Sequence, residues 1–293
     1  KLNADRLVIL RLGLGRDSMT MLALLGEGRL VVEGRAIGPS EVDAVVFTDP
    51  GHEWPFTYAL IPRVQAFCDK HGLRFLVQKK PPAEGPGGWI AWMRHQIVER
   101  KAAERQGRPV RHGVPPWRQH RPSTIEARCA SGFYHARIPL LEDYEAKEIW
   151  VTRDDPSCTI VHKIDPNREL LVDLYAERFG ALPQVPGTLK RTPTMKGVEA
   201  WTQSGRPPHL MLVGFAADEE RRVKDIKGGQ GVEGFEAEAY PLMEMGIRKD
   251  DEQRVLDTTI GVDPQGRFVR GGFSDVKKSG CRFCKYQDIA QFW

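Results

Sequence analysis

The sequence predicts an α/β protein whose core is a doubly wound, mostly parallel sheet. In the first part of the chain, short and continuous apolar runs alternate with segments that suit helices. Such runs are typical of strands buried on both faces, and their alternation with helices is typical of parallel sheets, whose ligands bind at the carboxyl ends of the strands. The predicted strands are 7–10, 42–47 and 73–78, and the predicted helices are 17–25 and 54–71.

The ends of the two helices carry their own signals. Asp17 and Ser18 are residues that cap a helix, and Gly72 follows the second helix as glycine often does. Three further kinds of element are predicted downstream: a buried strand at 209–214, amphipathic helices at 163–179 and 219–227, and a glycine-rich surface loop at 228–234.

The pattern weakens from Pro81 to about Pro139, where proline and glycine cluster and tryptophans occur singly. We interpret this stretch as a partly helical insertion beside the ligand-binding edge of the sheet. The chain therefore divides into an α/β domain over 1–240, with its insertion at 81–140, and a C-terminal segment over 241–293 that contains a Cys-x-x-Cys pair.

Composition narrows the class of protein. At 293 residues, 41% hydrophobic and 28% charged, the chain can bury a large core, and it has no apolar run long enough to span a bilayer. The first residues lack the pattern of a secretion signal. Five cysteines, an odd number, do not suggest a disulfide framework, so we expect a reducing, cytoplasmic setting.

Positive charge is concentrated in one segment. The net charge is +4, but residues 94–128 alone contain nine Lys and Arg against three Glu. This basic segment indicates a polyanionic partner such as nucleic acid, although solvated arginines have the same pattern. Trp89 and Trp92 lie just before this segment and Trp117 lies within it. These tryptophans either stack on bases or pack the insertion onto the core.

The loop after the first strand, Gly13-Leu14-Gly15-Arg16-Asp17-Ser18, is the strongest local candidate for a ligand site. It contains neither the G-x-x-x-x-G-K-[ST] of a P-loop nor the third glycine of G-x-G-x-x-G. Backbone amides and the positive end of a helix dipole nevertheless form an anion site at such a place. From the residues alone, a phosphate site and a plain capped turn are both open.

Five ordered segments resemble one family. The loop is similar to the PP-loop of the ATP pyrophosphatases and of the PAPS reductase-like (adenine nucleotide alpha hydrolase-like) proteins, although it departs from their Ser-Gly-Gly-x-Asp-Ser at the first two positions. The other four segments are "VVFTDPGHEWPFTY" (45–58), "SCTIVHKIDP" (157–166), "VGFAADEERR" (213–222) and "SGCRFCKYQ" (279–287). They resemble the Asp-Thr-Gly-x-Glu, Cys and Lys-x-x-Pro, Gly-x-x-x-Asp-Glu-x-x-Arg and Cys-x-x-Cys elements of the reductase-like branch, which mobile elements and phages also carry.

The resemblance implies a Rossmann-like fold that binds ATP and Mg²⁺. In this family a substrate oxygen attacks the α-phosphorus and pyrophosphate leaves, while the protein positions the groups and stabilises charge. The residues implied to bind the nucleotide are Gly13, Leu14, Gly15, Arg16, Asp17, Ser18, Phe47, Thr48, Asp49, Gly214, Asp218 and Glu219. The residues implied to act in catalysis are Arg16, Asp17, Ser18, Lys163 and Arg222.

Several of these residues also have a purely structural interpretation. Asp17 either caps the helix or faces the ligand, and Asp49 either reaches ribose or Mg²⁺ or makes a turn with Pro50-Gly51. Lys163 and Arg222 grip phosphate or sulfate, or are simply solvated. His52 and His162 form no obvious triad.

The cysteines suggest metal chemistry. Cys281 and Cys284 have the spacing of a zinc site, an iron–sulfur cluster or a redox dithiol, and a metal site needs distant ligands as well. Cys158 is the best third ligand, and Cys129 is a possible fourth for a [4Fe-4S] cluster or Zn²⁺. Cys68 is more typical of a buried thiol.

Three functions follow from this set. The first is an enzyme that cleaves ATP to AMP and pyrophosphate to activate or sulfurate a substrate, with nucleic acid as a candidate through residues 94–128. The second is a sulfonucleotide reductase, disfavoured because the chain ends in "CKYQDIAQFW" rather than in a Glu-Cys-Gly-Leu-His tail. The third is a non-catalytic nucleotide-binding subunit of a nucleic-acid complex. Protein partners or a homodimer are compatible with each.

Overall fold

In the computed structural model, five parallel strands form one sheet in the order β5-β4-β1-β6-β7. The residues that the structure describes are 1–85, 88–109, 113–139, 142–143, 160–180, 201, 203–220, 223 and 235–277. The strands are β1 (Val8–Arg11), β4 (Ala44–Thr48), β5 (Phe75–Gln78), β6 (His209–Leu212) and β7 (Glu236–Ala239). A mostly parallel sheet with helices on both faces confirms the predicted α/β class.

The central strand, β1, lies between β4 and β6. Val8 and Leu10 are fully buried on one face of the sheet and Ile9 is buried on the other. This is why the strand reads as an unbroken apolar run. The chain leaves β1 toward β4 and later returns to its other side as β6, so the direction of winding reverses at β1, where such sheets bind ligands.

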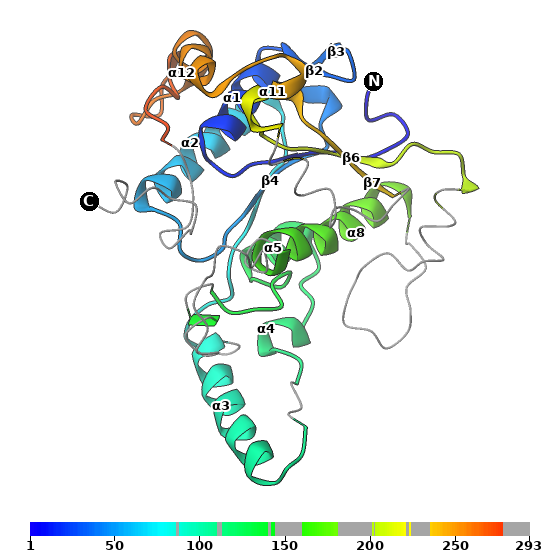
Figure 1. Cartoon of the computed structure of the whole chain (residues 1–293), viewed down its shortest axis with the longest axis vertical. Coiled ribbons are helices and arrows are strands. Elements are labelled where there is room, and N and C mark those ends of the chain that lie inside the picture. The colour runs from blue at the N-terminus through cyan, green and yellow to red at the C-terminus, as the bar shows by residue number, and fades with distance from the viewer. Residues whose placement is uncertain are drawn as a thin grey trace.

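Helices cover both faces of the sheet (Figure 1). The helices α1 (Arg16–Gly26), α2 (Pro55–His71), α11 (Pro241–Glu244) and α12 (Lys249–Thr258) lie on one face, and α5 (Ile125–Ala130) and α8 (Asp165–Phe179) lie on the other. The α2 helix ends at Gly72, whose φ of +66° is the left-handed conformation that glycine adopts readily.

The described part of the C-terminal segment packs onto the first of these layers. Leu242, Leu256, Val262 and Phe273 belong to the same buried cluster as the leucines of α1. Two antiparallel pairs complete the layer, β2 (Leu30–Val32) with β3 (Arg35–Ile37), and β8 (Ile260–Val262) with β9 (Phe268–Arg270). Residues 241–277 thus share a core with the α/β domain.

The predicted strand and helix bounds differ from the observed ones by a few residues, and several elements were not predicted, namely β2, β3, β7, α11, α12, β8 and β9. The β7 strand has the sequence Glu-Ala-Glu-Ala, which contains no apolar run, and it forms because β6 supplies a complete set of parallel partners. The α12 helix has a strongly charged first half and was also missed. The predicted helix at 219–227 and the loop at 228–234 fall largely outside the described residues.

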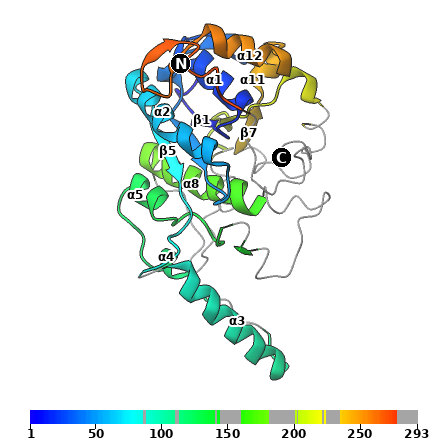
Figure 2. The same cartoon turned by 90° about the vertical axis from the view of Figure 1, so that its left-hand side faces the viewer.

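The insertion begins directly after β5. It contains α3 (Trp89–Arg105) and α4 (Pro116–Gln119), followed by α5. Figure 2 shows α3 projecting away from the body of the molecule. Its base is held by a small apolar cluster in which Trp89, Trp117 and Ile138 are buried. None of the helices in the described ranges combines the length and the apolar character needed to cross a bilayer.

Candidate functional site

The Gly13–Ser18 loop lies at the carboxyl end of β1, at the position where the winding of the sheet reverses. The Leu12 amide donates to the Val46 carbonyl at 2.8 Å, so the chain stays tied to β4 until the loop begins. The α1 helix starts at Arg16, and its first amides have no carbonyl partner within the helix. This arrangement places a helix N-terminus at the ligand-binding edge of the sheet.

Ser18 holds the loop together. Its Oγ accepts a hydrogen bond from the Gly13 amide and donates one to the Gly15 carbonyl, both at 3.1 Å. The Gly15 carbonyl also accepts the first helical bond, from the Met19 amide at 2.9 Å. Ser18 itself is buried. In this structure its hydroxyl therefore shapes the loop.

Leu14 occupies a left-handed conformation, with a φ of +57°. This region is uncommon for residues other than glycine and costs about 1–2 kcal/mol. The Leu14 side chain is fully buried in the core that α1 shares, which offsets this cost. The position where the family has a glycine is thus a core residue here.

Gly214 brings the segment after β6 against the start of α1. A methyl group on Gly214 would stand 3.0 Å from the Ser18 backbone nitrogen and 3.2 Å from two Asp17 atoms. Those distances are tight and most of the atoms are backbone, so only glycine fits without displacing the loop. The structure therefore brings Gly214 against Asp17 and Ser18, which lie about two hundred residues earlier in the sequence.

Behind the loop, three acidic side chains meet. Asp17 interacts with Glu219, from the segment after β6, and with Glu252 of α12. Burial and then the Asp17 carboxylate raise the pKa of Glu252 to about 9, and burial followed by the Glu219 charge raises the pKa of Asp17. The raised pKa values of both groups favour one proton shared between the carboxyl groups of Glu252 and Asp17. Sequence reasoning missed Glu252 because α12 was not predicted.

Two basic residues border this acidic cluster of Asp17, Glu219 and Glu252. Lys249, at the start of α12, lies 2.7 Å from a Glu219 carboxylate oxygen, and its amide donates to Asp218 at 3.2 Å. Arg16 lowers the pKa of Glu252, although burial and the acidic neighbours outweigh it. Asp218 and Glu219 therefore fasten α12 to the segment after β6.

At the end of β4, the predicted nucleotide residues are largely occupied by internal contacts. Phe47 lies in the core, and the Thr48 hydroxyl lies 2.6 Å from Gln78 Oε1 and 3.0 Å from Asn167 Oδ1. Asp49 Oδ1 accepts hydrogen bonds from the Gly51 amide at 2.7 Å and from the Tyr58 hydroxyl at 2.8 Å. Asp49 thus makes the Asx-type turn that was the structural alternative.

Lys163 lies on the same edge, in a π-helical turn (Ile160–Ile164) that leads into α8. Its Nζ is 3.3 Å from a carboxylate oxygen of Glu53, which is 3% exposed. A carboxylate buried to this extent requires a positive neighbour. Lys163 thus has a structural role, whether or not it also meets a ligand.

His162 belongs to a chain of polar contacts that sequence reasoning missed. Lys80, just after β5, donates to His162 Nδ1 at 2.9 Å, and His162 Nε2 lies 3.5 Å from Asp143. Because an ammonium group only donates, Nδ1 is the acceptor and the ring proton is on Nε2, facing Asp143. His162 is 2% exposed, so its imidazole is shielded from solvent. No spacing in the sequence signals this array.

Cys129 is buried in the second apolar cluster, and burial raises the pKa of its thiol to about 12. Cys68 is buried as expected, with a thiol pKa also raised to about 12 by burial. Arg222, Cys158, Cys281 and Cys284 lie outside the described residues. Within the described residues, no group of three or more His, Cys, Asp or Glu side chains is arranged to hold a metal ion.

Much of the basic segment is used internally. Arg118 makes a two-pronged ion pair with Glu169 at 2.7 and 3.1 Å, while Arg121 and Arg128 both pair with the buried Asp173. These contacts tie the insertion to α8. Two tryptophans pack at the base of the insertion. Trp89 and Trp117 are buried, and the Trp117 indole N–H donates to the His135 carbonyl at 2.7 Å. For these two tryptophans the packing interpretation is confirmed.

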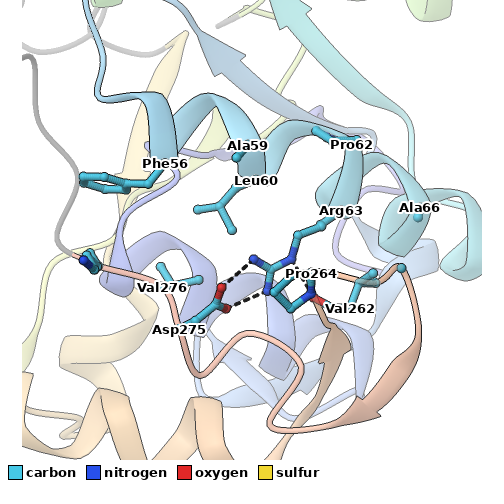
Figure 3. A pocket seen from close by; sticks show the side chains of 12 residues that line it. Phe56, Ala59, Leu60, Pro62, Arg63, Ala66, Val262, Pro264, Asp275 and Val276 are labelled. Atoms are coloured by element: carbon cyan, nitrogen blue, oxygen red, sulfur yellow. Dashed lines mark hydrogen bonds and ion pairs between the residues drawn. The ribbon is translucent and has the colours of Figure 1, made fainter.

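A hollow lined by none of the loop residues lies elsewhere on the molecule. It has a volume of about 360 Å³ and runs between α2 and residues 262–277 (Figure 3). Arg63 crosses it to form a paired contact with Asp275 at 2.7 and 2.8 Å and donates to the Val262 and Gly272 carbonyls. Arg63 thus fastens the β8–β9 segment to α2, and the hollow is the space beside this clamp.

Comparison with protein-family models, with curated proteins and with solved structures found no match to this chain. The interpretation of the site therefore depends on its residues and geometry.

Proposed function

We propose that the protein binds ATP at the Gly13–Ser18 loop and cleaves it at the α-phosphate to activate a second substrate. The observation that carries this proposal is the position of the loop: a helix N-terminus at the carboxyl end of the central strand, with Gly214 packed against its first turn. The resemblance to the PP-loop family, which extends over five ordered segments, supports an adenine nucleotide as the ligand.

The chemistry proposed is a displacement at phosphorus. An oxygen of the acceptor attacks the α-phosphorus, the bond to the bridging oxygen of the β-phosphate breaks, and pyrophosphate leaves as the acceptor oxygen loses its proton. The loop amides and the dipole of α1 stabilise the charge on the phosphates, and they are already ordered by Ser18. Arg16 adds a positive charge at the start of the helix.

The acidic cluster behind the loop affects this proposal. Three carboxyl groups close to a phosphate site would repel the ligand if all were ionised. The proton held between Glu252 and Asp17, with the ion pair of Lys249 and Glu219, reduces that negative charge. The ligand that we propose is thus a nucleotide whose phosphates carry Mg²⁺, because the metal ion lowers the negative charge brought close to these carboxyl groups.

The test is a product assay with Mg-ATP labelled at the α-phosphate, with and without nucleic acid. We expect pyrophosphate, together with AMP that is released when water hydrolyses the adenylated acceptor or itself attacks the α-phosphorus. Tight ATP binding without any cleavage would instead identify a nucleotide-binding subunit, and formation of sulfite from a sulfonucleotide and a dithiol would identify a reductase. Metal, iron and sulfide analysis after anaerobic purification tests the proposed cysteine site separately, because a fully active protein without metal would contradict it.

A further inference from the structure

The exposed face of α3 carries a stripe of positive charge. Of the seventeen residues of this helix, only Trp89 and Ala103 are buried. At about 100° per residue, Arg94, Lys101 and Arg105 fall within about 40° of arc, on the side opposite the buried Ala103. All three side chains are exposed. The stripe thus points away from the protein.

The stripe is distinct from the other basic residues of the insertion. Arg118, Arg121 and Arg128 pair with acidic residues of α8. On α3 itself, Arg100 pairs with Glu104 at 3.0 Å, and Arg108 just beyond the helix pairs with Glu99 at 3.1 Å.

For the three stripe residues the situation is different. Within the described ranges, no carboxylate pairs with Arg94, Lys101 or Arg105. The structure therefore divides the basic segment into side chains that form ion pairs within the protein and side chains that face solvent.

We propose that the stripe of Arg94, Lys101 and Arg105 is a docking surface for the phosphate backbone of a nucleic acid. It spans about 16 Å along the helix, which matches about five nucleotides of a strand. Charge complementarity supplies the attraction, since each Lys or Arg that neutralises a phosphate releases counterions. Val98, which lies beside the stripe and is 63% exposed, adds a contact for a sugar or base.

A lipid surface is a poorer fit for this helix. Helices that lie in a membrane interface bury a continuous apolar face rich in Trp, Phe or Leu. The large apolar side chains of α3, Trp89, Trp92 and Met93, pack instead against Trp117 and Ile138. Only Ile97 and Val98 remain as exposed large apolar residues of the helix.

The position of α3 relates this surface to the loop. The helix follows β5 after a short connection from Gln78, so it is rooted at the same edge of the sheet as the Gly13–Ser18 loop. Figures 1 and 2 show the helix extending from the body as an arm. That the bound nucleic acid is the acceptor of the activated group rests on the proposed function, whereas the binding itself does not.

The experiment measures the anisotropy of labelled oligonucleotides of one sequence, as single-stranded DNA, RNA and duplex DNA, across a range of salt. The triple variant R94Q/K101Q/R105Q should weaken binding at least about tenfold at moderate salt and reduce the slope of log K against log[salt] by about 2–3. Preference for DNA or for RNA identifies the kind of nucleic acid.

The matched control is R29Q/R254Q/R267Q, which removes the same charge from exposed arginines elsewhere, with side chains 59%, 73% and 69% exposed. It should change affinity less than about twofold. Equal weakening by both triples would overturn the proposal, as would binding to anionic phosphatidylserine vesicles that exceeds binding to every oligonucleotide. ATP cleavage by the wild-type protein, measured with and without nucleic acid, distinguishes the two proposals. If the wild-type protein cleaves no ATP under either condition but the stripe variant alone loses oligonucleotide binding, the docking surface stands and the proposed function fails.

Discussion

The two halves of the ligand-binding edge are built from opposite chemistry. At β1 and β6, a backbone loop and a helix N-terminus are backed by the acidic cluster of Asp17, Glu219 and Glu252. At β4 and β5, two lysines contact buried acidic side chains. Lys163 forms an ion pair with Glu53, and Lys80 is linked through His162 to Asp143. The first half offers main-chain donors to an anion, while the second offers side-chain ammonium groups.

This difference predicts how each half responds to substitutions and to pH. The loop half depends on close backbone approach and on a shared proton, so it is sensitive to steric bulk and to pH. The lysine half depends on hydrogen bonds between side chains, so it is sensitive to the loss of single polar groups. Four substitutions test this contrast.

The largest effect is expected from Gly214→Val. The added side chain has no room beside Ser18 and Asp17, and overpacking of this kind costs about 2–3 kcal/mol. We expect the loop to shift and ATP affinity to fall at least about tenfold, as measured by calorimetry and urea unfolding. The control Gly38→Val, with no atom nearer than 3.9 Å to the added group, should leave ATP affinity unchanged. If Gly214→Val bound ATP as tightly as the wild-type protein, the loop would not be part of the nucleotide site.

Glu252→Gln tests the shared proton. Between the ordinary pKa of a glutamate and the folded value of about 9, the folded state holds a proton that the unfolded state has lost, so stability falls as pH rises through this window. The amide of glutamine donates to Asp17 without needing a proton. We expect the variant to equal wild type near pH 5 and to exceed it by on the order of 2 kcal/mol near pH 8, measured by urea unfolding. Parallel curves for the two proteins would contradict this, and the exposed Asp250→Asn on the same helix is the control.

On the lysine half, His162→Phe should destabilise the protein by about 1–2 kcal/mol, because Lys80 and Asp143 each lose a buried polar contact. ATP binding should change little, since the substitution lies on the β4–β5 side. The exposed His120→Phe provides the comparison in the same unfolding assay. A loss of ATP affinity larger than that of Gly214→Val would show that the two halves act as one site.

The smallest effect is expected from Ser18→Ala. It removes two hydrogen bonds of 3.1 Å within the loop, at a cost of about 1 kcal/mol. ATP affinity should fall severalfold because the loop is less ordered, as calorimetry will show. The exposed Ser40→Ala should match wild type. An unchanged affinity in Ser18→Ala would mean that glycine geometry alone holds the loop.

The sequence by itself determined the inner strands of the sheet, the approximate ends of α1, α2 and α8, and the position of the loop. These features depend on local patterns: apolar runs such as residues 7–10, the glycine at 72, and a loop between a strand and a helix. Each can be read within a few residues of chain. The resemblance on which the proposed ligand depends likewise involves short segments.

Only the tertiary structure decided which groups face one another. Glu252 meets Asp17 because α12 packs on α1, and Lys80 meets His162 because the chain returns to β5 before α8. The basic segment is one continuous block in the sequence. In the structure, ion pairs with Glu169 and Asp173 engage three of its arginines and leave the α3 stripe facing solvent. Charge counts along a chain do not distinguish these cases, because pairing across space depends on contacts between residues far apart in sequence.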